Sequence, residues 1–226
     1  MNILAFDTAT PICSIGLASE KGTWYIEIDA GQRHSESFMD AADMLMRLGG
    51  LQPDDLDGVA CMKGPGSFTG LRVGFSAAKG ICLALGIPLL PVPTLDCLVR
   101  PSSGFPGLIA PVIDAKQHCY FTALYRGEER LTDYMDADAR SIAELLQGTD
   151  PILLTGLDAD LLYSELKSIP SLRDRLQLDP CRRKGGAREL LALAKLRLAK
   201  PDHIETEVFT GPLYLRKSDA ELQTLK

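Results

Sequence analysis

The stretch that decides the fold is 63-KGPGSFTGLRVGFSAAKG-80, in which three glycines fall within seven positions before a long run of small and apolar residues. It follows a short apolar segment over 58–62, which we predict to be a buried strand, and leads into a helix predicted over 68–85. A strand, a glycine-rich turn and a helix N-terminus in this order present free backbone amides to an anion. The stretch therefore predicts an α/β domain with this turn at a strand-to-helix corner.

The glycine spacing matches neither of two familiar phosphate-binding motifs. Five residues separate Gly64 from Gly70, one more than in a P-loop, and Leu71 and Arg72 stand where a P-loop has Lys and Ser or Thr. The dinucleotide motif needs its third glycine one residue sooner. Without a lysine we expect weak anion binding here. The nucleotide contacts that remain candidates in this turn are Gly64, Gly66 and Ser67, and Ser67 is also the expected N-cap of the helix.

Two predicted helices carry more apolar surface than one sheet can cover. The helix over 68–85 has one narrow polar stripe, formed by Arg72, Ser76 and Lys79, and the helix that runs from Ser35 to 49 has two apolar faces. We predict that the second faces bind a partner subunit; the alternative is that the second half of the chain covers them. The predicted interface comprises Phe38, Met39, Ala42, Leu45 and Met46 on the first helix, and Gly70, Leu71, Gly74, Ala77, Ala78 and Ile81 on the second.

For the first hundred residues, the apolar pattern predicts the order β-β-β-α-β-α-β. Strands are expected over 2–6, 12–18, 23–29, 58–62 and 87–91. The segment 100-RPSSGFPG-107 is rich in Pro, Ser and Gly and is the best domain boundary, so we expect domains over 1–102 and 103–226. Beyond it the pattern restarts, with strands expected over 108–113, 119–125, 131–135 and 152–155 and helices over 141–146, 158–166 and 187–199.

The two halves begin alike. The segments 3-ILAFDTATPICSIGLA-18 and 108-LIAPVIDAKQHCYFTALY-125 each contain a buried strand that ends in Asp, a tight turn and a second strand. An internal duplication of a β-β-β-α-β-α unit explains this similarity. We expect Asp7, with its neighbour Thr8, and Asp114 to lie at the two lips of a cleft between the lobes. The family resemblance given below implies that carboxylates at such strand ends orient the magnesium of a nucleotide. The alternative is that both aspartates cap turns.

Composition excludes several classes of protein. A formal net charge of −6 argues against binding nucleic acid by general basicity, and the hydrophobic content of 46% is typical of a globular chain. The six cysteines show no CxxC pair and lie mostly in apolar runs, as in a reducing cytoplasm. Asp7 interrupts the first apolar run too early for a signal peptide, and no run reaches the roughly 18 apolar residues that span a bilayer. We expect a soluble cytoplasmic protein that does not enter a membrane.

Four segments together carry a resemblance to a known family: 1-MNILAFDTAT-10, 64-GPGSFTGLRVG-74, 113-IDAKQ-117 and 212-PLYLRKSDAE-221. The chain resembles the TsaB family, also called YeaZ, along its whole length. The resemblance implies an actin-like (ASKHA, ribonuclease H-like) fold of two duplicated lobes. It also implies a role in the synthesis of threonylcarbamoyladenosine, the modified base next to the anticodon in tRNA.

The resemblance further implies a non-catalytic scaffold. Such a chain forms a heterodimer with a catalytic TsaD-type paralogue through the two helices of its first lobe, is joined by a TsaE-type ATPase, and meets tRNA through the complex. The complex uses ATP and a metal, and this chain is assigned no catalytic residue and no metal ligand. In isolation it is expected to form a homodimer through the same surface.

The family also resembles the glycoproteases (peptidase M22-like), and a metallopeptidase is the least favoured reading. The catalytic paralogues have a metal-binding histidine pair at HxxxH spacing, where this chain has Thr94 and Leu98. The three histidines, at 34, 118 and 203, form no such pair. The alternative that stays open is an ATPase or phosphotransferase with its own site between Asp7 and Asp114. The one glycine pair late in the chain, 185–186, is flanked by basic residues, which argues against a complete ATP site.

Overall fold

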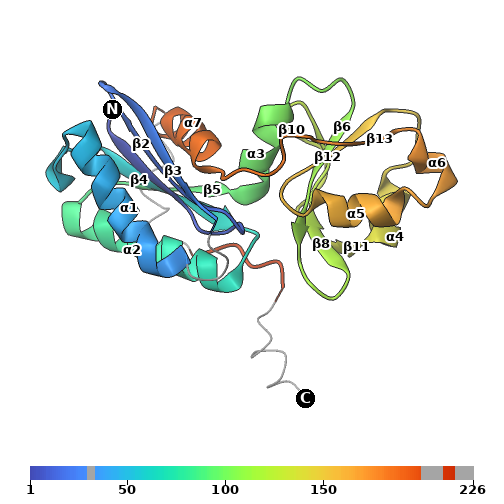
Figure 1. Ribbon diagram of the computed structural model, residues 1–226, viewed down its shortest axis with the longest axis horizontal. Coiled ribbons are helices and arrows are strands. Elements are labelled where there is room, and N and C mark those ends of the chain that lie inside the picture. The colour runs from blue at the N-terminus through green and yellow to red at the C-terminus, as the bar shows by residue number, and fades with distance from the viewer. Residues whose placement is uncertain (30–33, 200–210, 217–226) are drawn as a thin grey trace, which may run out of the picture. The chain divides into compact units, whose positions relative to one another are not determined.

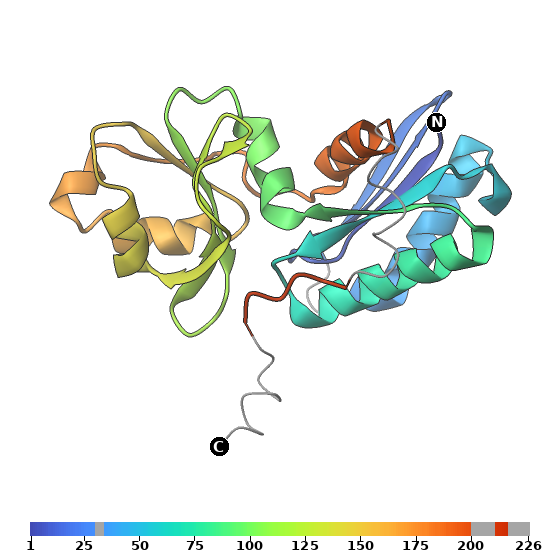
Figure 2. The same cartoon turned by 180° about the vertical axis from the view of Figure 1, so that it is seen from behind.

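The computed structural model describes residues 1–29, 34–199 and 211–216, which form two compact α/β units (Figures 1 and 2). Unit 1 comprises Met1–Cys97 and Lys184–Leu213, and unit 2 comprises Leu98–Arg183 and Tyr214–Lys226. The expected division into 1–102 and 103–226 is therefore wrong for the C-terminal helix α7 (Ala187–Leu198), which belongs to unit 1. Its apolar face, formed by Leu190, Leu191 and Ala194, is buried on the sheet of unit 1, and sequence pattern does not say which sheet will cover such a face.

Unit 1 contains a five-stranded sheet in the order β3-β2-β1-β4-β5. The strands are β1 (Ile3–Asp7), β2 (Cys13–Ser19), β3 (Gly22–Ile28), β4 (Gly58–Gly64) and β5 (Leu89–Pro93), close to the predicted ranges. The first three strands form an antiparallel meander, and β4 and β5 run parallel to β1. The carboxyl ends of β1, β4 and β5 consequently meet at one edge of the sheet, where Asp7 lies.

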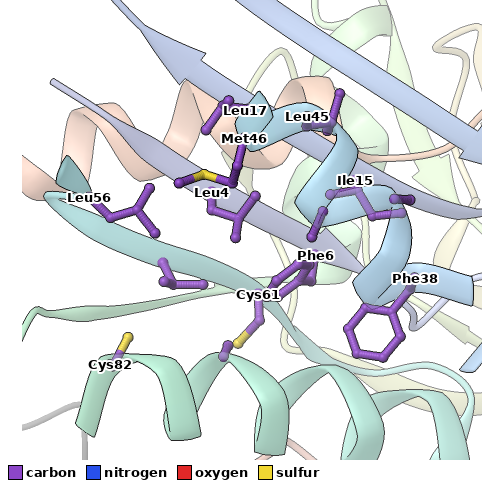
Figure 3. Packing of buried hydrophobic residues seen from close by; sticks show 14 of the residues in the cluster. Leu4, Phe6, Ile15, Leu17, Phe38, Leu45, Met46, Leu56, Cys61 and Cys82 are labelled. Atoms are coloured by element: carbon purple, nitrogen blue, oxygen red, sulfur yellow. The ribbon is translucent and has the colours of Figure 1, made fainter. Parts of the chain in front are cut away.

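Helices cover both faces of this sheet. Figures 1 and 2 show α1 (His34–Gly49) and α2 (Phe68–Leu85) on one face and α7 on the other. Strand β1 is buried on both sides, so Leu4 and Phe6 point towards α1 and α2 while Ile3 and Ala5 point towards α7. Phe6 meets Phe38 of α1 edge to face, with ring centroids 5.5 Å apart (Figure 3). Unit 1 is thus a three-layer α/β/α structure with Asp7 at the end of its most buried strand.

Helix α2 begins and ends as the sequence predicts. The hydroxyl of Ser67 accepts a hydrogen bond from the N–H of Gly70 at 3.2 Å, and Gly86 ends the helix in the left-handed region at φ +67°. By length and composition, α2 is the one helix of the described residues that is apolar enough to cross a membrane. One face of this helix, with Leu71, Phe75 and Ala78, is buried inside unit 1.

Unit 2 has two sheets, in the orders β10-β9-β6-β12-β13 and β11-β8-β7. The strands are β6 (Leu108–Pro111), β7 (Ile113–Asp114), β8 (Cys119–Thr122), β9 (Tyr125–Arg126), β10 (Glu129–Arg130), β11 (Met135–Asp138), β12 (Ile152–Thr155) and β13 (Leu176–Leu178). Its helices are α4 (Ala139–Leu145), α5 (Ala159–Leu166) and α6 (Pro170–Arg173), and α3 (Thr94–Val99) links the two units. The strands predicted over 108–113 and 119–125 each divide between the two sheets, and the strand predicted over 131–135 lies over 135–138 instead.

The two units share one topology. In unit 1, β1 pairs antiparallel with β2 and parallel with β4, and β4 pairs parallel with β5. In unit 2, β6 pairs antiparallel with β9 and parallel with β12, and β12 pairs parallel with β13. A helix follows the last parallel strand in each case: α3 after β5 and α7 after β13. This repetition agrees with the internal duplication predicted from the two similar segments.

Candidate functional site

Asp7, the first candidate nucleotide contact, is completely buried at the end of β1. Its Oδ1 accepts hydrogen bonds from the N–H groups of Ala9 and Thr10, at 3.1 and 3.3 Å. Its Oδ2 accepts from the hydroxyl of Thr10 at 3.0 Å and from the N–H of Gly186 at 2.9 Å. Burial raises the pKa of Asp7 to about 6 although these four donors lower it. The carboxylate is therefore already surrounded by groups of its own chain.

The glycine pair 185–186 brings the N-terminus of α7 onto this carboxylate. A Cβ at Gly186 would lie 2.9 Å from Asp7 Oδ2 and 2.5 Å from the Met62 methyl group, and one at Gly185 would overlap Ser14. The N–H of Ala187 donates to Ser14 Oγ at 2.9 Å. The positive end of the helix thus faces the acidic side chain, an arrangement that stabilises both. This is the physical reason for two adjacent glycines at this point.

The glycines of the opening stretch serve close packing inside unit 1. A Cβ at Gly66 would lie 2.5 Å from the carbonyl oxygen of Ala9, and Cβ atoms at Gly70 and Gly74 would overlap Thr8. The hydroxyl of Thr8 donates to the carbonyl of Gly70 at 2.6 Å. The turn after β1 thus lies directly against the start of α2, and glycine is needed because backbone approaches backbone.

The other two candidate contacts in this stretch are also in use. The N–H of Ser67 donates to the carbonyl of Ala9 at 2.8 Å, while its hydroxyl caps α2. Gly64 has φ +108°, a Cβ there would lie 2.5 Å from the carbonyl oxygen of Leu213, and the N–H of Leu213 donates to Lys63 at 2.6 Å. The five candidate nucleotide contacts of unit 1 therefore all have contacts with their own chain.

Asp114, the sixth candidate, lies in unit 2 at the end of β7. Its Oδ1 accepts from the N–H of Lys116 at 2.7 Å, and its Oδ2 forms an ion pair with Lys116 Nζ at 2.6 Å. The N–H of Asp114 donates to Asp158 at 2.9 Å. Lys116, Gln117 and His118 all have positive φ, between 55° and 63°. Asp114 stabilises this left-handed turn, the alternative role that the sequence left open.

Thr94 and Leu98, the positions at which the resemblance implies metal-binding histidines in the catalytic paralogues, do not fit a metal. Thr94 and Leu98 are buried, and a threonine hydroxyl and a leucine do not replace two imidazoles. Within residues 1–29, 34–199 and 211–216, no three side chains of His, Cys, Asp or Glu gather where they would hold a metal ion. His203 lies outside the described residues. We derive no step through a metal on this chain.

The predicted partner interface needs correction. Seven of its residues are buried in unit 1: Phe38, Ala42, Leu45, Met46, Leu71, Gly74 and Ala78. Figure 3 shows three of them, Phe38, Leu45 and Met46, in the core cluster. Met39 is exposed, and Gly70, Ala77 and Ile81 are half-buried, although Gly70 packs on Thr8. Three apolar residues on the same helices that were not in the predicted set, Met44, Leu48 and Leu83, are 56%, 56% and 63% exposed. For Leu83 the sequence did offer a signal, because this apolar residue continues the polar stripe of Arg72, Ser76 and Lys79 on α2.

The chain is thus an α/β protein of two units with the same topology. In its first unit, the carboxylate of Asp7 at the end of β1 accepts a hydrogen bond from Gly186 at the start of α7. The family model for TsaD, tRNA N6-adenosine threonylcarbamoyltransferase, matches residues 28–224. The tRNA threonylcarbamoyladenosine biosynthesis protein TsaB of Bacillus subtilis is 33% identical over 168 residues, covering 71% of this chain and 73% of the relative. TsaB of Escherichia coli is 32% identical over 57% of each chain.

A solved structure gives the same result for the fold. YeaZ from Pseudomonas aeruginosa superposes with a TM-score of 0.76 at 22% identity, covering 95% of this chain and 99% of that one. The chain belongs to the TsaB (YeaZ) family, within the wider family that the TsaD model describes. The predicted resemblance and the predicted actin-like fold of two lobes are both confirmed.

Proposed function

We propose that this protein is a non-catalytic subunit in the biosynthesis of threonylcarbamoyladenosine in tRNA, and that it acts by binding a catalytic TsaD-type paralogue. Its relatives in Bacillus, Haemophilus and Escherichia are named for this biosynthesis. One observation supports the binding role above all others: Met39, Met44, Leu48 and Leu83 are exposed on α1 and α2. The complex would also include a TsaE-type ATPase and tRNA, and would work in the cytoplasm.

The exposed side chains favour a protein partner for a physical reason. Only 28% of the residues of α2 are buried, although the helix is apolar enough to suit a membrane. The second half of the chain does send a helix, α7, to unit 1, but α7 covers the opposite face of the sheet and leaves these side chains exposed. Single exposed apolar residues are ordinary, whereas four on two neighbouring helices, rimmed by charges such as Asp43 and Arg47, resemble a protein interface.

The contacts of Asp7 support the non-catalytic part of the proposal. An ATPase of this fold needs a strand-end carboxylate that faces its ligand, and Asp7 instead accepts four hydrogen bonds from unit 1. Thr94 and Leu98 stand where a metal site would need histidines. We therefore place the chemistry, with its ATP and metal, on the partner and assign this chain the role of scaffold.

The test is a charge placed in the exposed face. Leu83→Glu should weaken binding to the TsaD-type paralogue at least tenfold, since burying an unpaired carboxylate at an interface is costly. Leu161→Glu on α5 is the matched control, because Leu161 is also an exposed leucine on a helix. Binding is measured by calorimetry, and threonylcarbamoyladenosine formation is measured in the reconstituted reaction. Equal binding by wild type and Leu83→Glu would contradict the proposal.

A further inference from the structure

The open edge of the unit 1 sheet carries a second interaction surface. Strand β3 is the last strand on its side of the sheet and pairs with β2 alone. The pairing runs without a bulge from Cys13–Ile28 to Ser19–Gly22, so all seven residues of β3 are regular and extended. Among the described residues no strand pairs with its outer edge, which leaves a row of backbone donors and acceptors available to another strand.

This edge lacks most of the devices that keep edge strands apart. It contains no proline, and Glu27 is the one charged residue within Gly22–Ile28. Trp24, Ile26 and Ile28 are only half-buried, and they pack towards the core beneath α1. The Trp24 ring lies against Gly49 at the end of α1, next to the exposed Leu48. The edge is therefore seven residues long, regularly paired on its inner side and apolar on one face, which favours pairing with another strand.

We propose that a second copy of this chain pairs antiparallel with β3, edge to edge, with the two-fold axis at Tyr25. An antiparallel pair of identical strands is self-complementary, as a two-fold interface requires. With the axis at Tyr25, all seven residues pair and the apolar residues stay on one face: Gly22 opposes Ile28, Thr23 opposes Glu27, and Trp24 opposes Ile26. Moving the axis to Trp24 or Ile26 would leave only five of the seven residues paired.

The charges next to the strand support this register. Lys21 lies in the turn before β3, where its Nζ donates to the carbonyl of Gly49 at 3.4 Å, and Asp29 follows the strand; both residues are exposed. With the axis at Tyr25, Lys21 of one copy opposes Asp29 of the other, and symmetry creates this pair twice. The Arg188 guanidinium carbon lies 4.6 Å from the Tyr25 ring centroid, so Glu27 of the second copy, diagonal to Tyr25, approaches a positive charge. No like charges face each other in this register.

A cross-link at the axis tests the geometry. Directly opposed residues in an antiparallel pair have Cα atoms about 4.5–5.5 Å apart, which lies within the disulfide range of about 4.4–6.8 Å. Tyr25→Cys, in a Cys119→Ser, Cys181→Ser and Leu83→Glu background, should form a covalent dimer under mild oxidation. The background removes the two cysteines that are not buried and any self-association through α2. Thr23→Cys, on the same strand face, is the matched control and should not cross-link, because it opposes Glu27.

Charge reversal tests the register without touching the strand. Lys21→Asp or Asp29→Lys alone, in the Leu83→Glu background, should weaken dimerisation on the order of tenfold, and the two together should restore it. The dissociation constant is measured by sedimentation. A chain that sediments as a monomer at all concentrations, equal cross-linking of the two cysteine variants, or single variants that the double variant does not rescue would each overturn the inference. None of these outcomes bears on binding of the TsaD-type paralogue through α1 and α2, so the two proposals fail separately.

Discussion

The carboxylate of Asp7 accepts a hydrogen bond from the backbone N–H of Gly186, 179 residues later in the sequence, at 2.9 Å. This contact joins the end of the first strand to the start of α7, after the chain has passed through the whole of unit 2. Leu190, Leu191 and Ala194 then bury their side chains on the sheet. The Asp7 carboxylate thus holds the start of α7 against the end of β1 and completes the fold of unit 1.

Asp7→Asn should destabilise the protein by about 1–3 kcal/mol. An asparagine carbonyl replaces one carboxylate oxygen, but its NH2 group faces N–H or O–H donors in place of the other, so buried donors lose their acceptor. The measurement is the free energy of unfolding in urea at pH 4, where Asp7 is protonated in the folded state and carries no buried charge. Asp40→Asn, on the exposed side of α1, is the control and should change little. Wild-type stability in Asp7→Asn would contradict the anchoring role.

Asp7 should also make stability depend on pH. Burial raises the pKa of Asp7 from 3.8 to about 6, so the folded state retains a proton that the unfolded state releases between these values. The stabilisation that this proton provides is complete below about pH 4 and is lost as pH rises through 6, by up to about 3 kcal/mol. Urea unfolding between pH 4 and 7 should show this decline in wild type relative to Asp7→Asn. Parallel curves for the two proteins would show that Asp7 does not titrate in this range.

Replacing either of two glycines in α2 by alanine should change the stability of the protein, but in opposite directions. A Cβ at Gly74 would overlap Thr8, so Gly74→Ala should destabilise the fold by about 1–3 kcal/mol. Nothing lies within 4 Å of a Cβ at Gly80, so Gly80→Ala should stabilise the helix by up to about 1 kcal/mol. Thermal unfolding of both variants tests the difference in sign. If Gly74→Ala instead folds normally and binds the partner poorly while Gly80→Ala binds it normally, Gly74 belongs to the interface.

Arg216 should anchor the C-terminal segment to unit 2. Its Nε and Nη2 donate to Asp136 at 2.6 and 2.7 Å, and its Nη1 donates to the carbonyl of Ala115 at 2.8 Å. The Arg216–Asp136 pair is largely buried and bidentate, and a lysine cannot reproduce the two parallel hydrogen bonds. Arg216→Lys should therefore lower the free energy of unfolding by about 1–2 kcal/mol. The control is Arg140→Lys, whose ion pair with Glu144 is exposed and contributes little. The rate of hydrogen exchange at the backbone amides of β11, which contains Asp136, should rise in Arg216→Lys and not in Arg140→Lys.

Most strands and helices of unit 1 could be predicted from the local spacing of apolar residues. Each strand and helix from β1 to β5 lies close to its predicted range, because alternating or helical apolar spacing shows directly which face is buried. Unit 2 was harder: its apolar runs pass from one sheet to the other, and both parts are buried, so periodicity does not mark the division. Most of the residues predicted for the partner interface lie on the buried faces of α1 and α2, because the sheet takes the larger apolar face of each helix.

The sequence was sufficient to predict the order of elements from β1 to β5, the duplication, the family and the absence of a histidine pair at Thr94 and Leu98. These are properties of neighbouring residues and of their spacing. Only the tertiary structure decided that α7 crosses back to unit 1, that Asp7 serves Gly186, and that Gly70 and Gly74 make room for Thr8. Those facts depend on contacts between residues more than sixty positions apart, and the burial that creates such contacts has no signature in local sequence.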